Sequence, residues 1–378
     1  MKPGRRVFVP ATEIVAHEAV PGEFGWLDMP MTDVVVLFGG ASSERLVSVA
    51  SAQNVSSQLP EANLWFIARD GTVFDLTPEE LAAHQRAFEL ELHPSKAAAF
   101  PSLAASLDFR GKGQTFLLAL HGGAGENGSI QRELEARGLA FTGSGSEASA
   151  RAFDKAVTKT LVGSRGVRLA EAQLIEPSDD VSALQSTLDA LLEKQPRWVL
   201  KPVADGSSFG LIHLAAKAQT PTAAEALAQL KVRYLAEAFV TGRELTVGVV
   251  DAPAGPSALP VSEVRLAKDA SFDYAGKYLG RGTEELTPAP ITDAEREAAQ
   301  TMAVIAHQAV GCFGYSRTDM ILSADGQGPV FLEINTLPGL TRASFIPQQL
   351  AAAGRGFRPF LDQQLELARA RRDQAPRR

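Results

Sequence analysis

The chain has 378 residues. This length exceeds what a single hydrophobic core usually holds together, so it predicts two or three domains. Hydrophobic residues make up 45% and charged residues 21%, as in a globular protein. The net charge of −7 argues against a general nucleic-acid binder, which requires a basic surface. No apolar run reaches membrane-spanning length, so no membrane partner is predicted. A single cysteine, Cys312, excludes internal disulfides and fits a reducing compartment.

Residues 1–30 show little hydrophobic periodicity and lack the continuous apolar stretch of a signal peptide. The segment MTDVVVLFGG, which begins at Met31, has the character of a natural protein start. We therefore expect residues 1–30 to be an N-terminal extension outside the fold.

Residues 31–145 contain three apolar runs, DVVVLFGG, NLWFIARDG and TFLLALHGG, which predict strands, and the intervening segment ASSERLVSVASAQNVSSQL predicts a helix. Such alternation indicates a parallel α/β sheet, whose ligands lie outside the carboxyl ends of the strands. We expect Gly39, Gly40, Glu44 and His121 at that edge. The spaced GxGxxG pattern is absent, which makes a dinucleotide-dependent oxidoreductase the weaker alternative.

The next region, residues 146–236, predicts a second unit, of the α+β class. One helix is expected from about Ser149 to a stop at Gly163 or Gly166. This helix carries Lys155, for which a solvated helix face and a functional role both stay open.

The segment RWVLKPVADGSSFGL predicts a strand, a glycine-serine loop and a second strand. The first strand delivers Lys201, and hydroxyl and backbone N–H groups of the loop, which contains Ser207 and Ser208, can cradle phosphate oxygens. The loop is not a P-loop, because its lysine precedes the glycines, and an ordinary flexible hairpin loop is the alternative.

The most informative segment is SRTDMILSADGQGPVFLEINT, which predicts two strands folded back at SADGQG. Arg317 then faces Asn335, Asp319 faces Glu333, and all four side chains share one face. Two close carboxylates repel unless a cation lies between them, and Asp, Glu and Asn oxygens suit Mg²⁺ bound with substrate phosphates. The arginine can stabilise a phosphoryl group. A surface hairpin with a salt bridge is the alternative.

Together, a carboxylate metal site, two lysines, a glycine-serine loop and an arginine predict phosphoryl transfer from a nucleotide. Helices follow this region, and the basic end ARARRDQAPRR is expected to be frayed and solvated.

The chain resembles the D-alanine–D-alanine ligases of the ATP-grasp superfamily from about Asp33 to about Gly356. Eight ordered blocks carry the resemblance: LFGGASSERLVS, LHGGAGENGSIQ, FTGSGSEASARAFDKAVTK, LKPVADGSSFG, GRELTVGVV, FDYAGKY, GYSRTDMIL and LEINTLPGLTRASFIP. It implies an α/β and α+β ATP-grasp fold, with a Rossmann-like parallel sheet domain over residues 31–145. Two α+β domains, residues 146–236 and 237–378, would hold ATP between them.

The resemblance also implies a reaction. ATP would phosphorylate the carboxylate of a first D-alanine, and the amine of a second D-alanine would attack the acylphosphate, for the synthesis of peptidoglycan precursors. Two Mg²⁺ ions, for which Mn²⁺ can substitute, are the implied cofactors. A homodimer in the bacterial cytoplasm is the implied setting.

Roles for single residues follow from the same resemblance. Glu44 is expected to bind the ammonium of the first D-alanine, with His121 lining that pocket. Arg317 and the backbone N–H of Gly339 would stabilise the tetrahedral intermediate. The remaining expectations are Ser207 and Tyr278 paired near Glu44, Ser344 and Phe345 at the second substrate, Lys155, Lys201, Ser208, Glu237, Phe239, Val240, Glu244 and Lys277 at ATP, and Asp319, Glu333 and Asn335 at the metal ions.

Four positions depart from the family pattern, and they put affinity and specificity in question more than activity: Leu46, Asn127, Ala238 and Leu337. A ligase that joins D-alanine to D-lactate or D-serine stays open, although Tyr278 favours dipeptide formation. In another class, a non-catalytic nucleotide-binding regulator is the alternative, and the retained Arg317 and metal ligands argue against it.

Overall fold

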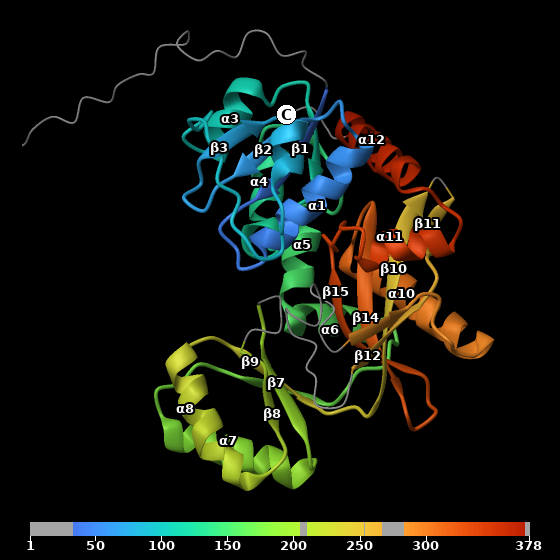
Figure 1. Ribbon diagram of the computed structural model, residues 1–378. Helices are drawn as coiled ribbons and strands as arrows, with labels where there is room; N and C mark the ends of the chain where they lie inside the picture. Colours follow the sequence, from blue (N-terminus) through green and yellow to red (C-terminus); the bar gives the residue numbers. More distant parts are fainter. Residues whose placement is uncertain (1–32, 205–209, 253, 267–282, 375–378) are drawn as a thin grey trace, which may run out of the picture. The chain divides into compact units, whose positions relative to one another are not determined.

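The computed structural model describes residues 33–204, 210–252, 254–266 and 283–374, which form three β-sheets with helices packed against them (Figure 1). The expected N-terminal extension lies outside the described residues, as do Ser207, Ser208, Lys277 and Tyr278. Among the described helices, none has the length and apolar character that crossing a bilayer requires.

The first sheet confirms the predicted parallel α/β architecture. Its strands lie in the order β3 (Val73–Leu76), β2 (Asn63–Ile67), β1 (Val34–Gly39), β4 (Thr115–Leu118) and β5 (Ala140–Phe141). All neighbours pair in parallel except β2 and β3, which are antiparallel. Every residue of β1 is buried, as expected for an apolar central strand with helices on its sheet.

The helices of this region connect the strands and bury their apolar sides against the sheet. They are α1 (Arg45–Gln58), α2 (Pro78–Ala83), α3 (Leu103–Arg110) and α4 (Ser129–Ala136), with a short 3₁₀ turn, η1, at Gly123–Gly125. The loops after β1 and β4 meet at the carboxyl edge, where the Ser48 hydroxyl accepts from Gly39 N and donates to Ala119 O. The edge predicted to carry the ligand site is therefore held together by hydrogen bonds.

The second sheet is smaller and antiparallel. Its order is β6 (Ala172–Ile175), β9 (Tyr234–Ala238), β7 (Trp198–Pro202) and β8 (Ile212–Leu214). Helices α7 (Val181–Lys194) and α8 (Thr220–Leu230) cover one face of it (Figure 1) and bury leucines against Trp198, with a 3₁₀ turn, η2, at Lys217–Gln219. The predicted domain boundary between residues 236 and 237 falls inside β9.

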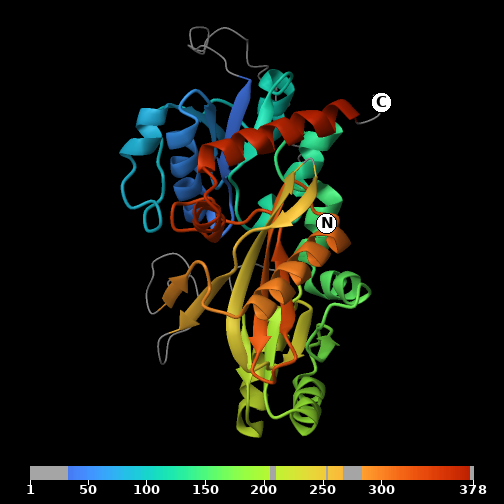
Figure 2. The ribbon, with the colours of Figure 1, turned by 90° about the vertical axis from the view of Figure 1, so that its right-hand side faces the viewer.

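The third sheet carries the predicted hairpin. Its order is β13 (Thr283–Leu286), β12 (Ser262–Leu266), β10 (Gly242–Ala252), β14 (Tyr315–Ser323) and β15 (Pro329–Asn335), with β11 (Gly255–Ala258) paired to β10. Helix α10 (Asp293–Val310) lies across one face (Figure 2), and their shared core includes Met302, Met320 and Phe331. The opposite face is left for the pocket described below.

The single helix predicted from Ser149 is wrong, because the chain breaks at Asp154 into α5 (Ser146–Phe153) and α6 (Lys155–Gly163). Asp154 is extended, with φ −89° and ψ 103°, and its carboxylate accepts from Ala156 N and Val157 N at 3.0 and 2.9 Å. Aspartate favours this N-cap position, because it satisfies donors that a helix start leaves unpaired. The predicted stop at Gly163 is confirmed.

The expectation of a frayed basic end is also wrong. After α11 (Phe345–Ala352), α12 (Phe357–Gln374) stays helical through most of it. The Arg371 guanidinium donates to Gly143 O and Phe141 O at 2.8 and 2.7 Å and lies over the rings of Phe141 and Phe313. Burial lowers the Arg371 pKa to about 10. This end of the chain is thus anchored against β5.

Candidate active site

The hairpin of β14 and β15 has the predicted register. Arg317 pairs with Asn335 and Asp319 with Glu333, and a β-bulge follows Asp319. All four side chains line one pocket, as the shared-face argument predicted.

Arg317 and Asp319 form a bidentate ion pair within that pocket. The guanidinium donates from Nε to Asp319 Oδ1 at 2.9 Å and from Nη2 to Oδ2 at 2.7 Å. A hydroxyl on β10, that of Thr246, donates to Oδ1 at 2.5 Å. The two charged side chains are 16% and 13% exposed, so the pair is no loose surface salt bridge. The two hydrogen bonds hold the plane of the Arg317 guanidinium in one orientation within the pocket.

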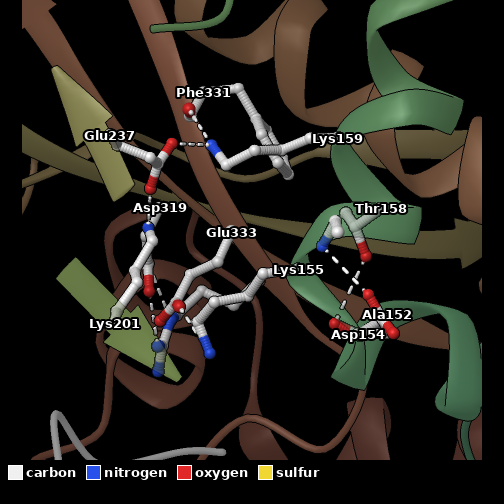
Figure 3. A network of polar contacts seen from close by, with 12 residues as sticks. Ala152, Asp154, Lys155, Thr158, Lys159, Lys201, Glu237, Asp319, Phe331 and Glu333 are labelled. Carbon is white, nitrogen blue, oxygen red and sulfur yellow. Dashed lines mark hydrogen bonds and ion pairs between the residues drawn. The ribbon is translucent and has the colours of Figure 1, made fainter. Parts of the chain in front are cut away.

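Lys155 is the first residue of α6, directly after the Asp154 cap. Its Nζ lies 3.7 Å from Glu333 Oε2, and its side chain is 11% exposed (Figure 3). The solvated-face alternative for this lysine is therefore wrong. The helix start aims its ammonium at the hairpin.

Glu237, on β9, is buried between two lysines, Lys159 and Lys201, and forms an ion pair with each (Figure 3). Lys159 also donates to Phe331 O at 3.3 Å. Burial would raise the Glu237 pKa, but the two ammonium groups hold it below the usual value. Burial lowers the Lys159 pKa to about 8, against the opposing effect of Glu237.

Lys159 was not predicted from the sequence, although a signal existed. It lies four residues after Lys155, so both lysines project from one side of α6. A lysine on an amphipathic helix usually contacts solvent. The partner of Lys159, Glu237, lies far away in sequence, so the sequence alone does not indicate that this lysine is buried.

His121 and Glu44 lie at the carboxyl edge of the first sheet, as predicted, and Glu44 lines the pocket. His121 is buried behind it, with Nδ1 3.1 Å from Leu337 O and Nε2 2.9 Å from the Ser51 hydroxyl. The carbonyl requires a donor, so Nδ1 carries the proton and Nε2 accepts. Burial lowers the His121 pKa to about 4, opposed by Glu44, so the ring is neutral at neutral pH.

Gly122 explains part of the glycine-rich turn that follows His121. Its φ is +66°, and a Cβ there would lie 2.8 Å from Glu44 Oε2. The residue therefore permits both the backbone conformation and the close approach to the carboxylate.

The pocket gathers side chains from segments that are far apart in sequence. Predicted residues on its wall are Glu44, Lys155, Glu244, Arg317, Asp319, Glu333, Asn335, Gly339, Ser344 and Phe345, and Glu126, Thr246 and Glu285 join them without having been predicted. Carboxylates thus outnumber the cations Lys155 and Arg317 on this wall. Such an excess favours cationic ligands.

Glu126 is one of these additional carboxylates. Burial, reinforced by Glu44, raises its pKa to about 7. A nearby like charge disfavours ionisation of a carboxyl group, so the charge of Glu44 acts in the same direction as burial on Glu126. Its sequence signal was its place in HGGAGENGSIQ.

Ser344, which also lines the pocket, directly precedes α11. Its hydroxyl accepts from Thr341 N at 3.2 Å and lies 2.8 Å from the Thr341 hydroxyl. A Cβ on Gly339 would lie 2.5 Å from the Ser344 Oγ, so a larger residue would displace the hydroxyl that contacts Thr341.

The predicted nucleotide contacts are partly separate from this pocket wall. Lys201, Glu237, Phe239 and Val240 belong to or directly follow β7 and β9. The Phe239 ring lies 3.7 Å from the Arg197 guanidinium carbon. Ser208 and Lys277 lie outside the described residues, and so does the predicted pair of Ser207 and Tyr278.

The predicted metal site has a donor set of mixed carboxylate and amide oxygens. Within the described part of the chain, no three His, Cys, Asp or Glu side chains cluster as a metal site. The predicted site rests instead on two carboxylates and the amide of Asn335, whose Oδ1 accepts from Leu337 N at 2.8 Å. These hard oxygen donors fit Mg²⁺, and Arg317 and Lys155 now balance the charges of Asp319 and Glu333.

Comparison with known proteins gives consistent matches. A family model described as D-ala D-ala ligase N-terminus matches residues 33–144, and one described as D-ala D-ala ligase C-terminus matches residues 161–366. The D-alanine–D-alanine ligase of Herminiimonas arsenicoxydans is 36% identical over 328 residues, which cover 86% of this chain and 87% of that protein.

Solved structures agree with these matches. The D-alanine–D-alanine ligase from Coxiella burnetii aligns with a TM-score of 0.73 at 25% identity, covering 90% of this chain and 94% of that one. The VanG D-Ala:D-Ser ligase from Enterococcus faecalis also aligns with a TM-score of 0.73, at 26% identity, covering 89% and 98%.

Proposed function

This chain belongs to the D-alanine–D-alanine ligase family, and we propose that it joins two D-alanine molecules, with ATP converted to ADP and phosphate. The observation that carries the proposal is the pocket in which Glu44, from the edge of the first sheet, meets the Arg317–Asp319 hairpin. One side suits an ammonium group and the other a phosphoryl group.

In the proposed reaction, the carboxylate of the first D-alanine takes the γ-phosphoryl group of ATP. The ammonium of the second loses a proton, and the resulting amine bonds to the acyl carbon. The bond from that carbon to the phosphate oxygen breaks, the nitrogen releases a second proton, and phosphate leaves. Glu44 holds the first ammonium, with His121 behind it. Arg317 and the Gly339 N–H stabilise the negative charge that develops on the tetrahedral intermediate.

The proposed nucleotide contacts are Lys155, Lys201, Glu237, Phe239, Val240 and Glu244, together with Ser208 and Lys277. Asp319, Glu333 and Asn335 would hold two Mg²⁺ ions, which supply charge neutralisation to the transferring phosphoryl group. The register that brings Asp319, Glu333 and Asn335 together on the wall of one pocket supports this assignment, because their oxygen atoms are hard donors. Ser207 and Tyr278 are proposed as the pair near Glu44, and Ser344 and Phe345 as contacts of the second substrate.

We also propose three domains, with residues 1–30 as an extension. The first covers residues 31–145, and the boundary predicted between residues 236 and 237 moves to the end of β9, because this strand pairs with β6 and β7 as far as Ala238. The third domain continues to residue 378. A homodimer in the bacterial cytoplasm, supplying peptidoglycan precursors, is the proposed setting. Light scattering of the purified chain tests the dimer.

The test of function is phosphate release from ATP by the full chain with Mg²⁺ and D-alanine. Release should require all three, and the dipeptide should appear in equal amount. Release that requires D-serine or D-lactate as well would reassign the acceptor, for which the similarity to a D-Ala:D-Ser ligase is the specific observation. No release with any D-amino acid would support a nucleotide-binding regulator instead.

A further inference from the structure

Glu285 is a pocket carboxylate with no role in the proposed reaction. It lies on β13, the edge strand of the third sheet, opposite Val264 of β12. Both residues line the pocket, in company with Arg317 and Ser344. Its neighbour Glu284 points to the other face, as strand alternation requires, and pairs with Arg265 at 3.6 Å.

The Glu285 carboxylate is held in place from α11. Gln348 Nε2 donates to Glu285 Oε2 at 2.7 Å and to Ala343 O at 2.7 Å. The Thr287 hydroxyl donates to the Gln348 amide oxygen at 3.2 Å, which fixes the orientation of that amide. Gln348 N also bonds to the Ser344 carbonyl at 3.2 Å. Glu285 and Ser344 are therefore parts of one braced unit.

The negative charge of the Glu285 carboxylate favours a cationic ligand in this part of the pocket. Burial raises the Glu285 pKa, although Gln348 and the charge of Arg317 oppose that rise. A partly buried carboxylate of this kind gains most from a cationic ligand. The second amino acid enters as a zwitterion, so its carboxylate and its ammonium each require a complement. Ser344 supplies the first in the proposed function, and a carboxylate beside it supplies the second.

We propose that Glu285 binds the ammonium group of the second amino acid and so makes the acceptor site select amino acids over hydroxy acids. Glu44 and Glu285, which line the same pocket, then each bind one of the two substrate ammonium groups. This inference rests on the proposed function and adds a specificity-determining residue to it. A hydroxyl group gives the Glu285 carboxylate no ammonium to pair with, and that penalty falls on D-lactate and not on D-alanine.

The test compares Glu285→Gln with wild type in the full chain with ATP and Mg²⁺. Two-site analysis of the D-alanine dependence of phosphate release separates the KM values of the first and second substrates. The second-site KM should rise by about tenfold or more, because a charge-assisted hydrogen bond is lost, while the first-site KM stays unchanged. In competition with D-lactate, the ratio of ester to dipeptide products should rise by a similar factor.

Glu284→Gln is the matched control, since its side chain is 63% exposed on the opposite face of the same strand, and it should leave both KM values unchanged. Glu285→Asp retains the charge and should keep D-lactate excluded. Glu285→Ala serves if the glutamine variant does not fold, with the same outcome expected.

Equal rises in both KM values, or an unchanged second-site KM and product ratio, would overturn the role of Glu285 and leave the ligase activity standing. Absence of activity in wild type would instead overturn the proposed function. The two failures are thus distinguishable.

Discussion

Arg317 illustrates what a single residue does in this pocket. Its guanidinium is fixed by two hydrogen bonds to Asp319, which limits its freedom before any substrate arrives. A preorganised donor of this kind stabilises developing charge without reorganising during the reaction.

We therefore expect Arg317→Ala to lower turnover on the order of 10²–10³-fold, by comparison with the loss of other oxyanion donors. Steady-state phosphate release measures the effect. Arg317→Lys retains charge without the planar fork and should recover part of it. Arg296→Ala, at an exposed arginine on α10, is the control. Turnover near that of wild type in Arg317→Ala would remove the residue from its assigned role.

The residue scale also shows where sequence reasoning succeeds. The four hairpin side chains were placed correctly, because strand alternation and a short turn fix which residues face one another. Lys159 and Glu285 could not be predicted as residues of the site, because the position of each side chain depends on a partner that is distant in sequence. No local pattern distinguishes a lysine paired with a buried glutamate from one in solvent.

At the scale of elements, strands were predicted better than helix limits. Apolar runs identified β1, β2 and β4, since a central parallel strand is apolar throughout. The break at Asp154 was overlooked, because the apolar period continues across the cap from α5 into α6. The basic end of the last helix is helical and anchored where the sequence predicts a frayed tail, because its charge is evident from the sequence and its aromatic partners are not.

Helix α12 provides the prediction at this scale. Replacing Arg371 by alanine removes two hydrogen bonds to carbonyls and the contacts with two rings, and leaves Phe141 O and Gly143 O without that donor. We expect the free energy of unfolding to fall by about 2–4 kcal/mol. Urea denaturation measures it.

The control for this change is Arg372→Ala, next along the helix, whose partner is the adjacent and exposed Asp373. An exposed ion pair contributes little, so its effect should stay within about 0.5 kcal/mol. Equal losses in the two variants would refute the anchoring role of Arg371.

At the scale of the whole molecule, the pocket exists because the first and third sheets both contribute to its wall. The sequence predicts each contribution separately, but hydrophobic patterning does not say which loops meet across the pocket. His121 shows the connection: its ring, on the loop after β4, donates to Leu337 O, which follows β15. The ionisation of groups buried there is therefore part of the stability of the whole fold.

Two of these groups titrate with opposite consequences. The His121 pKa falls from 6.5 to about 4 in the fold, so between those values the unfolded chain binds more protons and stability rises with pH. The Glu126 pKa rises from 4.5 to about 7, so the folded chain binds more protons there and stability falls with pH. The two effects therefore oppose each other in wild type.

Substitution should separate them. In His121→Gln, the Glu126 effect acts alone, so the free energy of unfolding should fall as the pH rises from 4.5 to 7. In Glu126→Gln, the His121 effect acts alone, and stability should fall as the pH drops from 6.5 towards 4. Urea denaturation across this range gives both slopes, with Glu147→Gln, at an exposed glutamate, as the control. Because the two slopes must have opposite signs, parallel pH profiles in the two variants would contradict the opposite pKa shifts of the two side chains.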